Sequence, residues 1–242
     1  MEKARGRYRF VDDLRGLLVL NMTLYHALYD LVFLFGYDIP WYLGRGAYLW
    51  QQSIAMGFVF LAGAGARLSR DNLRRGLVTL AGAFVVSAVA GFMGQPIYFG
   101  VLHLLGCCML LCHFLRPLWE RVSAPVGTAL CGGLFLLCRG VPRGYLGIGE
   151  LRLAALPRGL YSRAGYVFGF PDGSLPSADY VPLIPWVFLF FAGLFFFGWL
   201  LPRCARIEKS TPVLGAVGRN ALLIYLLHQP VVYGVLWLWQ QL

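Results

Sequence analysis

Seven apolar runs dominate this sequence, and most of them are as long as an α-helix that crosses a lipid bilayer. A helix rises about 1.5 Å per residue, so roughly 20 apolar residues cross a hydrocarbon core about 30 Å thick. The fifth run is the shortest and is rich in glycine. The pattern predicts an all-α, polytopic membrane helix bundle with about seven transmembrane helices. The expected spans are residues 17–36, 48–66, 77–93, 97–115, 126–137, 183–201 and 221–238.

Composition supports a membrane protein and excludes a soluble globular domain. Of the 242 residues, 59% are hydrophobic and only 13% are charged, and the mean hydropathy is +0.65. A net charge of +10 would favour nucleic acid as the partner of a soluble chain, but basic loop residues set topology in a membrane protein. We therefore expect contact with membrane lipids and not with nucleic acid. The six cysteines have no CxxC spacing, so we expect no metal site.

Most of the 21 Lys and Arg residues fall in the loops on one side of the membrane if all seven runs cross it. Cytoplasmic loops carry an excess of Lys and Arg, so we expect a cytoplasmic N-terminus and a C-terminus outside. The first run has no small-residue cleavage site, which indicates a retained helix and one integral-membrane domain over residues 1–242. The basic residues on the expected cytoplasmic side are Lys3, Arg5, Arg7, Arg9, Arg15, Arg67, Arg70, Arg74, Arg75, Arg116, Arg121, Arg203, Arg206, Lys209 and Arg219.

Residues 139–182 form the one long segment without an apolar run, and they are rich in Gly, Pro, Tyr and Arg. Their aromatic content argues against disorder. Two interpretations stay open at this point. The segment is either an extracytoplasmic or re-entrant loop that covers a cavity in the membrane, or a connector whose aromatic side chains anchor it at the interface.

The first run contains three polar residues, Asn21, His26 and Asp30. An ionisable group inside a span costs roughly 2.5–3.5 kcal/mol, so it needs a partner, a water-filled cavity or a function. His26 and Asp30 are four residues apart and share one helix face, where the carboxylate would orient the imidazole as a general base. Hydrogen bonding between helices is the alternative role. His26 lies about 16 Å beyond Arg15, near the bilayer middle, and this depth favours the functional interpretation.

Two further histidines lie inside later runs: His103 about 9 Å in from the expected outer end of the fourth run, and His228 roughly midway through the seventh. Each of them alone is typical of a buried structural histidine, but convergence with His26 near the midplane would favour a site. Asp179 and Tyr180 precede the sixth run, at its expected outer end. Asp179 either caps a helix or holds the hydroxyl or amine of an acceptor.

Several short motifs carry a resemblance to one family. Arg15 and His26 form an R-x10-H pattern on the first apolar run. The other stretches are residues 9–16 (RFVDDLRG), 99–106 (FGVLHLLG), 179–186 (DYVPLIPW), 214–220 (LGAVGRN) and 228–230 (HQP). In this order they resemble the bacterial members of the heparan-alpha-glucosaminide N-acetyltransferase catalytic domain family. The R-x10-H pair is also similar to that of the related acyltransferase-3 family, in which the histidine is essential to acyl transfer.

The resemblance implies a transmembrane acyltransferase of the bacterial plasma membrane. Such an enzyme takes an acetyl group from cytoplasmic acetyl-CoA and passes it to a sugar amine or hydroxyl on the other side. Animal lysosomal members carry an acetyl-accepting histidine after the first span, where this chain has residues 35–40 (FGYDIP) and no histidine. The resemblance therefore favours direct transfer, with His26 as general base, over an acetyl-histidine intermediate.

Acetyl transfer requires a base, donors to the tetrahedral oxyanion and cations for the phosphates of CoA. Tyr98, His103 and Asn21 are candidate oxyanion donors, and arginines near the cytoplasmic ends are candidate phosphate ligands, with topology as the alternative role of their charge. The expected site residues are His26, Asp30 and His103 for catalysis, Arg15, Asn21, Arg74 and Arg75 for acetyl-CoA, and Tyr98, Asp179, Tyr180 and His228 for the acceptor.

Two other functions remain open from the residues alone. The histidines could hold a b-type haem between helices, which would make the chain a redox protein. The polar residues at the midplane could instead line the path of a small-molecule transporter, although the sequence has no internal repeat. Gly63 and Gly65 allow close helix packing, either within the chain or in a homodimer.

Overall fold

The structure is a computed structural model that describes residues 8–149, 151–177, 179–204 and 211–242. The chain divides into two compact units. Unit 1 is Met1–Phe58 together with Arg203–Leu242, and unit 2 is Val59–Pro202. The long helix α2 begins in unit 1 and ends in unit 2.

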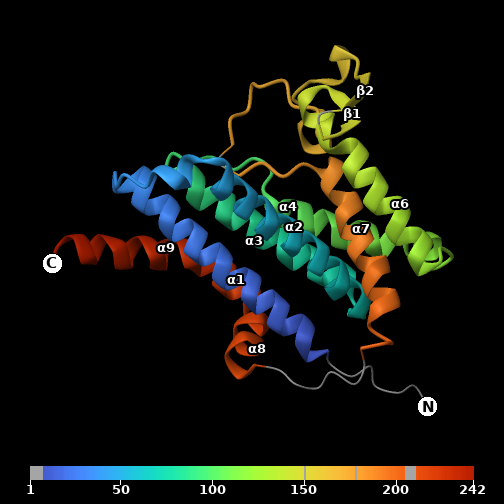
Figure 1. Cartoon of the computed structure of the whole chain (residues 1–242), viewed down its shortest axis with the longest axis horizontal. Helices are drawn as coiled ribbons and strands as arrows, with labels where there is room; N and C mark the ends of the chain where they lie inside the picture. The colour runs from blue at the N-terminus through green and yellow to red at the C-terminus, as the bar shows by residue number, and fades with distance from the viewer. Residues whose placement is uncertain (1–7, 150, 178, 205–210) are drawn as a thin grey trace. The chain divides into compact units, whose positions relative to one another are not determined.

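Unit 1 is built around the first and last helices of the chain. Its elements are α1 (Arg9–Tyr29), the π-helical turn η1 (Asp30–Leu34), the 3₁₀ turn η2 (Pro40–Leu43), the first part of α2 (Arg45–Leu68), α8 (Pro212–Arg219) and α9 (Ala221–Gln240). Helix α1 packs against both α8 and α9, so segments from opposite ends of the sequence lie side by side (Figure 1).

Unit 2 consists of packed helices and a small hairpin. Its elements are the end of α2, then α3 (Asn72–Phe92), α4 (Val101–Phe114), α5 (Arg116–Trp119), α6 (Ala124–Leu137), the 3₁₀ turn η3 (Cys138–Arg143), β1 (Tyr145–Ile148), β2 (Leu151–Ala155), the 3₁₀ turns η4 (Arg158–Leu160) and η5 (Tyr166–Phe168), and α7 (Leu183–Leu200). Helix α3 packs on α4, and α6 lies along α7 (Figure 1). Phe190, Leu194 and Leu104 are fully buried at the centre of the core.

Within the described residues, five helical segments are long and apolar enough to cross a membrane: Arg9–Leu34, Asn72–Phe92, Ala124–Arg143, Leu183–Leu200 and Ala221–Gln240. All seven predicted spans are largely helical, and the other two correspond to α2 and α4. Helix α4 has only 14 residues and so extends about 21 Å, less than the hydrocarbon thickness.

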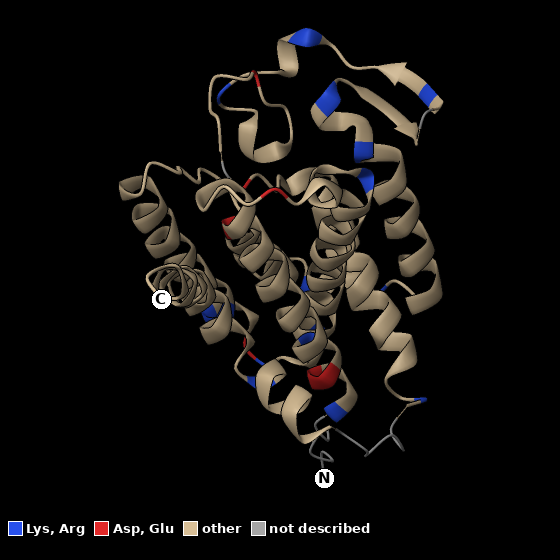
Figure 2. Cartoon of the chain, turned by 60° about the vertical axis from the view of Figure 1, so that its left-hand side comes forward, with Lys and Arg blue, Asp and Glu red and all other residues tan. Residues whose placement is uncertain are grey.

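The count of seven spans and the cytoplasmic N-terminus therefore stay predictions. Five of the basic residues on which the predicted orientation depends lie outside the described residues: Lys3, Arg5, Arg7, Arg206 and Lys209. The charged residues that are described gather near helix ends and in the segment that carries the hairpin (Figure 2). The fold is that of a helical integral membrane protein.

The prediction of an all-α helix bundle holds for most of the chain, and the long segment 139–182 adds one antiparallel hairpin, formed by β1 and β2. Gly144 ends η3 with a φ of 93°, which turns the chain out of the helical path and into β1. A bulge lies between Leu146 and Gly147. The two strands have only four and five residues, and each satisfies backbone hydrogen bonds by pairing with the other.

Glycine allows α1 and α8 to approach each other closely within unit 1. A Cβ atom on Gly218 would overlap the carbonyl oxygen of Asp12, and one on Gly16 would overlap the carbonyl oxygen of Leu214. The backbone of each helix therefore fills the space that a side chain would need. The backbone N–H of Thr211, which precedes α8, also donates to Asp13 Oδ2 at 3.0 Å.

Replacing Gly218 by alanine should destabilise the protein by about 1–3 kcal/mol, because the added methyl group forces α8 away from α1. Thermal unfolding in detergent measures the effect. Gly234→Ala in α9 is the matched control, since a Cβ there meets no atom within 4 Å. Equal melting temperatures for the two variants would contradict the close contact of α1 and α8.

In unit 2, a small residue of α2 allows this helix to pack closely against α7 of the same chain. A Cβ atom on Gly63 would overlap the carbonyl oxygen of Phe190 in α7, and one on Gly193 would overlap the carbonyl oxygen of Phe60. Gly63 is therefore buried by close packing inside one chain. A homodimer stays a prediction that does not need this face of α2.

Candidate active site

The centre of the first candidate site is Asp30, at the point where α1 changes into a π-helical turn. The N–H of Phe35 donates to the carbonyl oxygen of Asp30 at 2.9 Å, the wide hydrogen bond of a π turn. Such single turns occur frequently at functional sites. The Asp30 side chain is 0% exposed, and its Oδ1 atom accepts a hydrogen bond from Gln229 Nε2 at 2.6 Å. A residue of the last helix thus holds the carboxyl group of the first.

Two histidine rings meet between the same two helices, α1 and α9. The ring of His26 in α1 contacts the ring of His228 in α9, with 4.8 Å between ring centroids. Nδ1 of His228 lies 2.7 Å from the carbonyl oxygen of Tyr225. A carbonyl oxygen only accepts, so Nδ1 carries the proton and Nε2 carries the lone pair. His228 therefore has the tautomer that a general base requires.

Three buried polar atoms in this region lack a hydrogen-bond partner among the described residues: Asp30 Oδ2, His228 Nε2 and Gln229 Oε1. All three are acceptors, given the tautomer of His228. Buried polar atoms are normally paired, and an unpaired one is costly. We refer to His26, Asp30, Tyr225, His228 and Gln229 as the α1–α9 polar cluster. Its unpaired acceptors suit a ligand that donates several hydrogen bonds.

The predicted hydrogen bond between His26 and Asp30 is not formed among the residues that the structure describes, although the two side chains share one helix. Their spacing permits a contact, but the amide of Gln229 occupies one carboxyl oxygen and the ring of His26 packs on His228 instead. Gln229 and His228, both in α9, are therefore the partners of Asp30 and His26, which do not pair with each other. Catalytic roles for His26 and Asp30 stay predictions.

The second group of predicted residues meets in unit 2, at the N-terminal end of α4. The N–H of Val101 donates to Asp179 Oδ2 at 2.9 Å, so this carboxyl group caps the helix. Gly100 is needed here because a Cβ atom would overlap Asp179 Oδ2. The N–H of Gly100 donates to Nδ1 of His103 at 3.3 Å. His103 therefore carries its proton on Nε2 and presents a donor there.

Backbone pairing brings the two tyrosines of the prediction to the same place. Phe99 forms a parallel bridge with Tyr180, and the N–H of Val181 donates to the carbonyl oxygen of Phe99 at 3.0 Å. The Tyr180 hydroxyl donates to the carbonyl oxygen of Tyr166 at 2.6 Å. Tyr98 is 47% exposed, and its ring meets that of Tyr166 edge to face. We refer to Tyr98, His103, Asp179 and Tyr180 as the α4 N-terminal cluster.

Burial raises the pKa of Asp179, and the hydrogen bond from Val101 opposes this shift only in part. The folded protein thus binds the proton of this carboxyl group more tightly than the unfolded chain does. Stability contributed by the protonated form is therefore lost as pH rises from the ordinary pKa of aspartic acid through the raised value.

Exchanging Asp179 for asparagine should remove this pH dependence, because the amide oxygen still caps Val101 and carries no charge. We expect melting temperatures of Asp179→Asn to equal or exceed those of the natural protein above the raised pKa. Asp179→Ala loses the cap and should cost about 1 kcal/mol at every pH. Parallel melting curves for the natural protein and Asp179→Asn across acidic pH would contradict the assignment.

The four residues predicted for acetyl-CoA lie in both units. In unit 1, Asn21 accepts from Trp50 Nε1 at 3.1 Å and donates to the carbonyl oxygen of Leu17, and Arg15 pairs with Asp12 at 3.2 Å. In unit 2, the N–H of Arg74 is capped by Asp71, and Arg75 Nη1 donates to the carbonyl oxygen of Gly65 at 2.8 Å. These contacts support local structure, so roles in donor binding stay predictions.

The model of one protein family matches the chain over residues 7–230, which is nearly its whole length. The family is described as heparan-alpha-glucosaminide N-acetyltransferase, catalytic. This chain belongs to that family. Membership implies an acetyltransferase, and the five long apolar helices imply that it is integral to a membrane. No curated protein and no solved structure matches the chain.

The family predicted from the sequence motifs is thereby confirmed, and both polar clusters lie inside the matched region. The arrangement of the histidines also bears on the haem hypothesis. Axial ligands lie on opposite faces of a macrocycle, whereas the rings of His26 and His228 contact each other directly. This pair is therefore not arranged to hold a haem iron between its rings.

Sequence reasoning missed two residues of the α1–α9 polar cluster, Gln229 and Tyr225. Gln229 follows His228 inside an apolar run, and an amide at that depth needs a partner. That signal was present in the sequence. The contribution of Tyr225 comes from its backbone carbonyl, so no property of its side chain indicates it.

Proposed function

We propose that this membrane acetyltransferase moves an acetyl group from acetyl-CoA to the amine or hydroxyl of a sugar on the extracytoplasmic side. The observation that carries the proposal is the set of unpaired buried acceptors Asp30 Oδ2, His228 Nε2 and Gln229 Oε1 in the described structure. A sugar presents several hydroxyl groups, or an amine with hydroxyl groups, and so donates the hydrogen bonds that these atoms lack. Family membership supplies the reaction class.

His228 acts as the general base in this proposal. Its Nδ1–H is held by the carbonyl oxygen of Tyr225, which leaves the Nε2 lone pair for the proton of the acceptor. The acceptor nitrogen or oxygen attacks the thioester carbonyl carbon while Nε2 takes its proton. The tetrahedral intermediate then collapses, the C–S bond breaks, and the imidazolium returns the proton to the thiolate of CoA.

Asp30 and Gln229 orient the acceptor. Their 2.6 Å hydrogen bond fixes both side chains, so each presents one acceptor oxygen in a defined direction. His26 contacts the base directly and holds its ring in place. This assignment keeps the predicted direct transfer but gives the role of base to His228 instead of His26.

The distribution of basic residues indicates the side of the membrane from which acetyl-CoA binds. The basic residues of the loops support a cytoplasmic N-terminus in the bacterial plasma membrane, with acetyl-CoA on that side. A catalytic role for His103, which lies in unit 2, stays a prediction.

The test is transfer of label from radioactive acetyl-CoA to a panel of amino sugars and neutral sugars by the purified protein in liposomes. We expect an acetylated sugar and free CoA in equal amounts. Uptake of a sugar without acetylation would favour the transporter hypothesis and contradict the proposal. Absorbance of a bound haem in the purified protein would favour the redox hypothesis instead.

A further inference from the structure

Arginine side chains gather in unit 2 at the end of α4 that is opposite His103. Arg67, Arg75 and Arg116 lie near Cys112, which is in the last turn of α4. These residues come from the end of α2, the start of α3 and the short helix α5. Three separate elements thus direct positive charge to one place.

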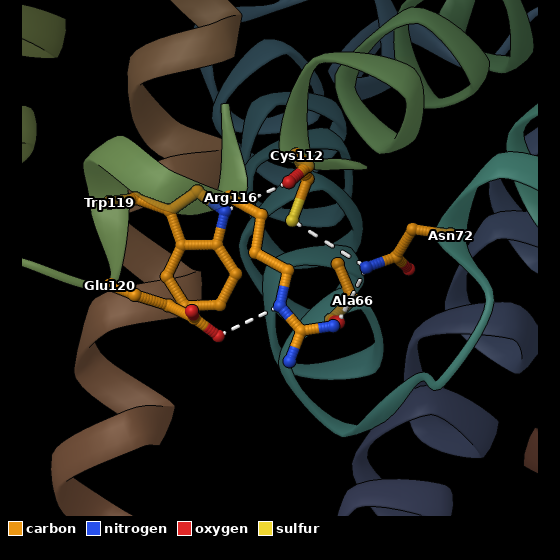
Figure 3. Close-up of polar contacts among 6 residues, drawn as sticks. All are labelled: Ala66, Asn72, Cys112, Arg116, Trp119 and Glu120. Atoms are coloured by element: carbon orange, nitrogen blue, oxygen red, sulfur yellow. Dashed lines mark hydrogen bonds and ion pairs between the residues drawn. The ribbon is translucent and has the colours of Figure 1, made fainter. Parts of the chain in front are cut away.

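Each of these arginines has a contact that orients its guanidinium group. Arg67 lies over the ring of Trp119, 5.0 Å from its centroid, and Trp119 Nε1 donates to the carbonyl oxygen of Cys112 at 2.8 Å. Arg75 donates to the carbonyl oxygen of Gly65. Figure 3 shows the pair of Arg116 with Glu120, which are 2.8 Å apart. A guanidinium has five N–H groups, so one that already has a partner in the protein can also bind a phosphate oxygen.

A buried amide at the same place also points to a ligand. Asn72 is 8% exposed, and its Nδ2 atom donates to the carbonyl oxygen of Ala66 at 2.9 Å and contacts Cys112 Sγ (Figure 3). Its Oδ1 atom has no hydrogen-bond partner within the described part of the chain. The contacts of Nδ2 fix which atom is the oxygen, so the amide presents an acceptor.

Positive charge exceeds negative charge in these segments. Residues 66–75 and 112–121 contain two acidic side chains, Asp71 and Glu120. The same segments contain six arginines, Arg67, Arg70, Arg74, Arg75, Arg116 and Arg121. The excess of positive charge suits a ligand with more than one negative charge, and arginine forms bidentate hydrogen bonds with phosphate.

We propose that Arg67, Arg75 and Arg116 bind the phosphates of the acyl-thioester donor, with Asn72 Oδ1 accepting a hydrogen bond from its nucleotide. The nucleotide then lies in unit 2, at the C-terminal end of α4.

This inference rests on the proposed function, because it names the binding site of the same donor. Two alternative roles for the positive charge lead to different results in a binding experiment. In one of them the arginines hold the phosphate of an anionic lipid, and in the other their charge only sets topology. Removing one arginine should weaken the binding of CoA if the arginines bind the donor, and the binding of anionic lipid if they bind lipid. It should change neither affinity if their charge only sets topology.

The test is equilibrium binding of CoA, adenosine 3′,5′-bisphosphate and acetyl-pantetheine to the protein in nanodiscs of zwitterionic lipid. The main variant is Arg116→Gln, because its side chain is 63% exposed and the fold does not depend on it. Arg45→Gln, at the other end of α2, is the control. We expect Arg116→Gln to weaken the binding of CoA and of the bisphosphate by about tenfold or more. The affinity for acetyl-pantetheine should not change.

Arg67→Lys tests phosphate binding at a second position. Lysine keeps the charge but lacks the planar guanidinium group that binds a phosphate through two N–H groups, so we again expect weaker nucleotide binding. Unchanged nucleotide binding in both variants would overturn the inference, as would equal loss of acetyl-pantetheine binding. Loss of co-purified anionic lipid from Arg116→Gln with unchanged CoA affinity would assign the arginines to lipid and also overturn it. Nucleotide binding is measured without turnover, so failure of acetyl transfer alone contradicts the proposed function and not this site.

Discussion

The variant His228→Gln should lose acetyl transfer by a factor of about 10²–10⁴, the usual contribution of a general base. Glutamine keeps the approximate volume of histidine and hydrogen-bonding atoms, but an amide does not take up a proton. The tautomer of His228, set by the carbonyl oxygen of Tyr225, is the reason to expect the base here. The measurement is the initial rate of label transfer from acetyl-CoA to the best acceptor sugar.

The matched control for this variant is His113→Gln, since His113 is an exposed histidine near the C-terminal end of α4. It should retain full activity.

The variant His26→Gln distinguishes the roles of the two histidines in the α1–α9 polar cluster. We expect a smaller loss of acetyl transfer than in His228→Gln, because His26 positions the base through ring contact. If His26→Gln abolishes transfer while His228→Gln keeps it, the base is His26, as the helical spacing predicts, and our assignment to His228 is wrong.

The second large effect is expected for Asp30→Asn. The asparagine oxygen still accepts from Gln229 Nε2, but an N–H₂ group replaces the carboxyl oxygen that has no partner in the described structure. A donor then faces the donors of the acceptor sugar. Loss of one accepted hydrogen bond and the new unpaired donor should lower kcat/KM for the acceptor by about 10–100-fold.

This change should raise the KM of the acceptor and leave that of acetyl-CoA unchanged. Removing a buried carboxyl group should not unfold the protein, because the amide is cheaper to bury, so the melting temperature should stay equal or rise. Asp38→Asn is the control, since Asp38 is exposed on the loop after α1. An equal increase in KM for both substrates would indicate general damage and contradict a role in acceptor binding.

Long apolar runs made most of the fold predictable. Hydrophobic length alone locates the helices, because a bilayer admits only segments whose backbone groups are paired within the segment. The hairpin of β1 and β2 was not predicted, since strands of four and five residues leave no periodic signal that separates them from a loop. The count of spans was also not decided, because α4 is apolar but only 14 residues long.

Most residues of the candidate site were recognisable in the sequence, but their contacts were not. Polar residues in apolar runs are few, so His26, Asp30, His103 and His228 were recognisable one by one. Helical spacing predicts only which side chains share a face of one helix, and it paired His26 with Asp30.

The sequence by itself therefore determined the class of protein, its family and the polar residues that its membrane helices carry, because these depend on local hydropathy and motif. The tertiary structure decided which of those residues meet. It bonded Asp30 to Gln229, placed His228 against His26 and used Asp179 to cap α4. The physical reason is that a buried polar atom takes the nearest complementary partner in space, and packing between distant segments decides which partner that is.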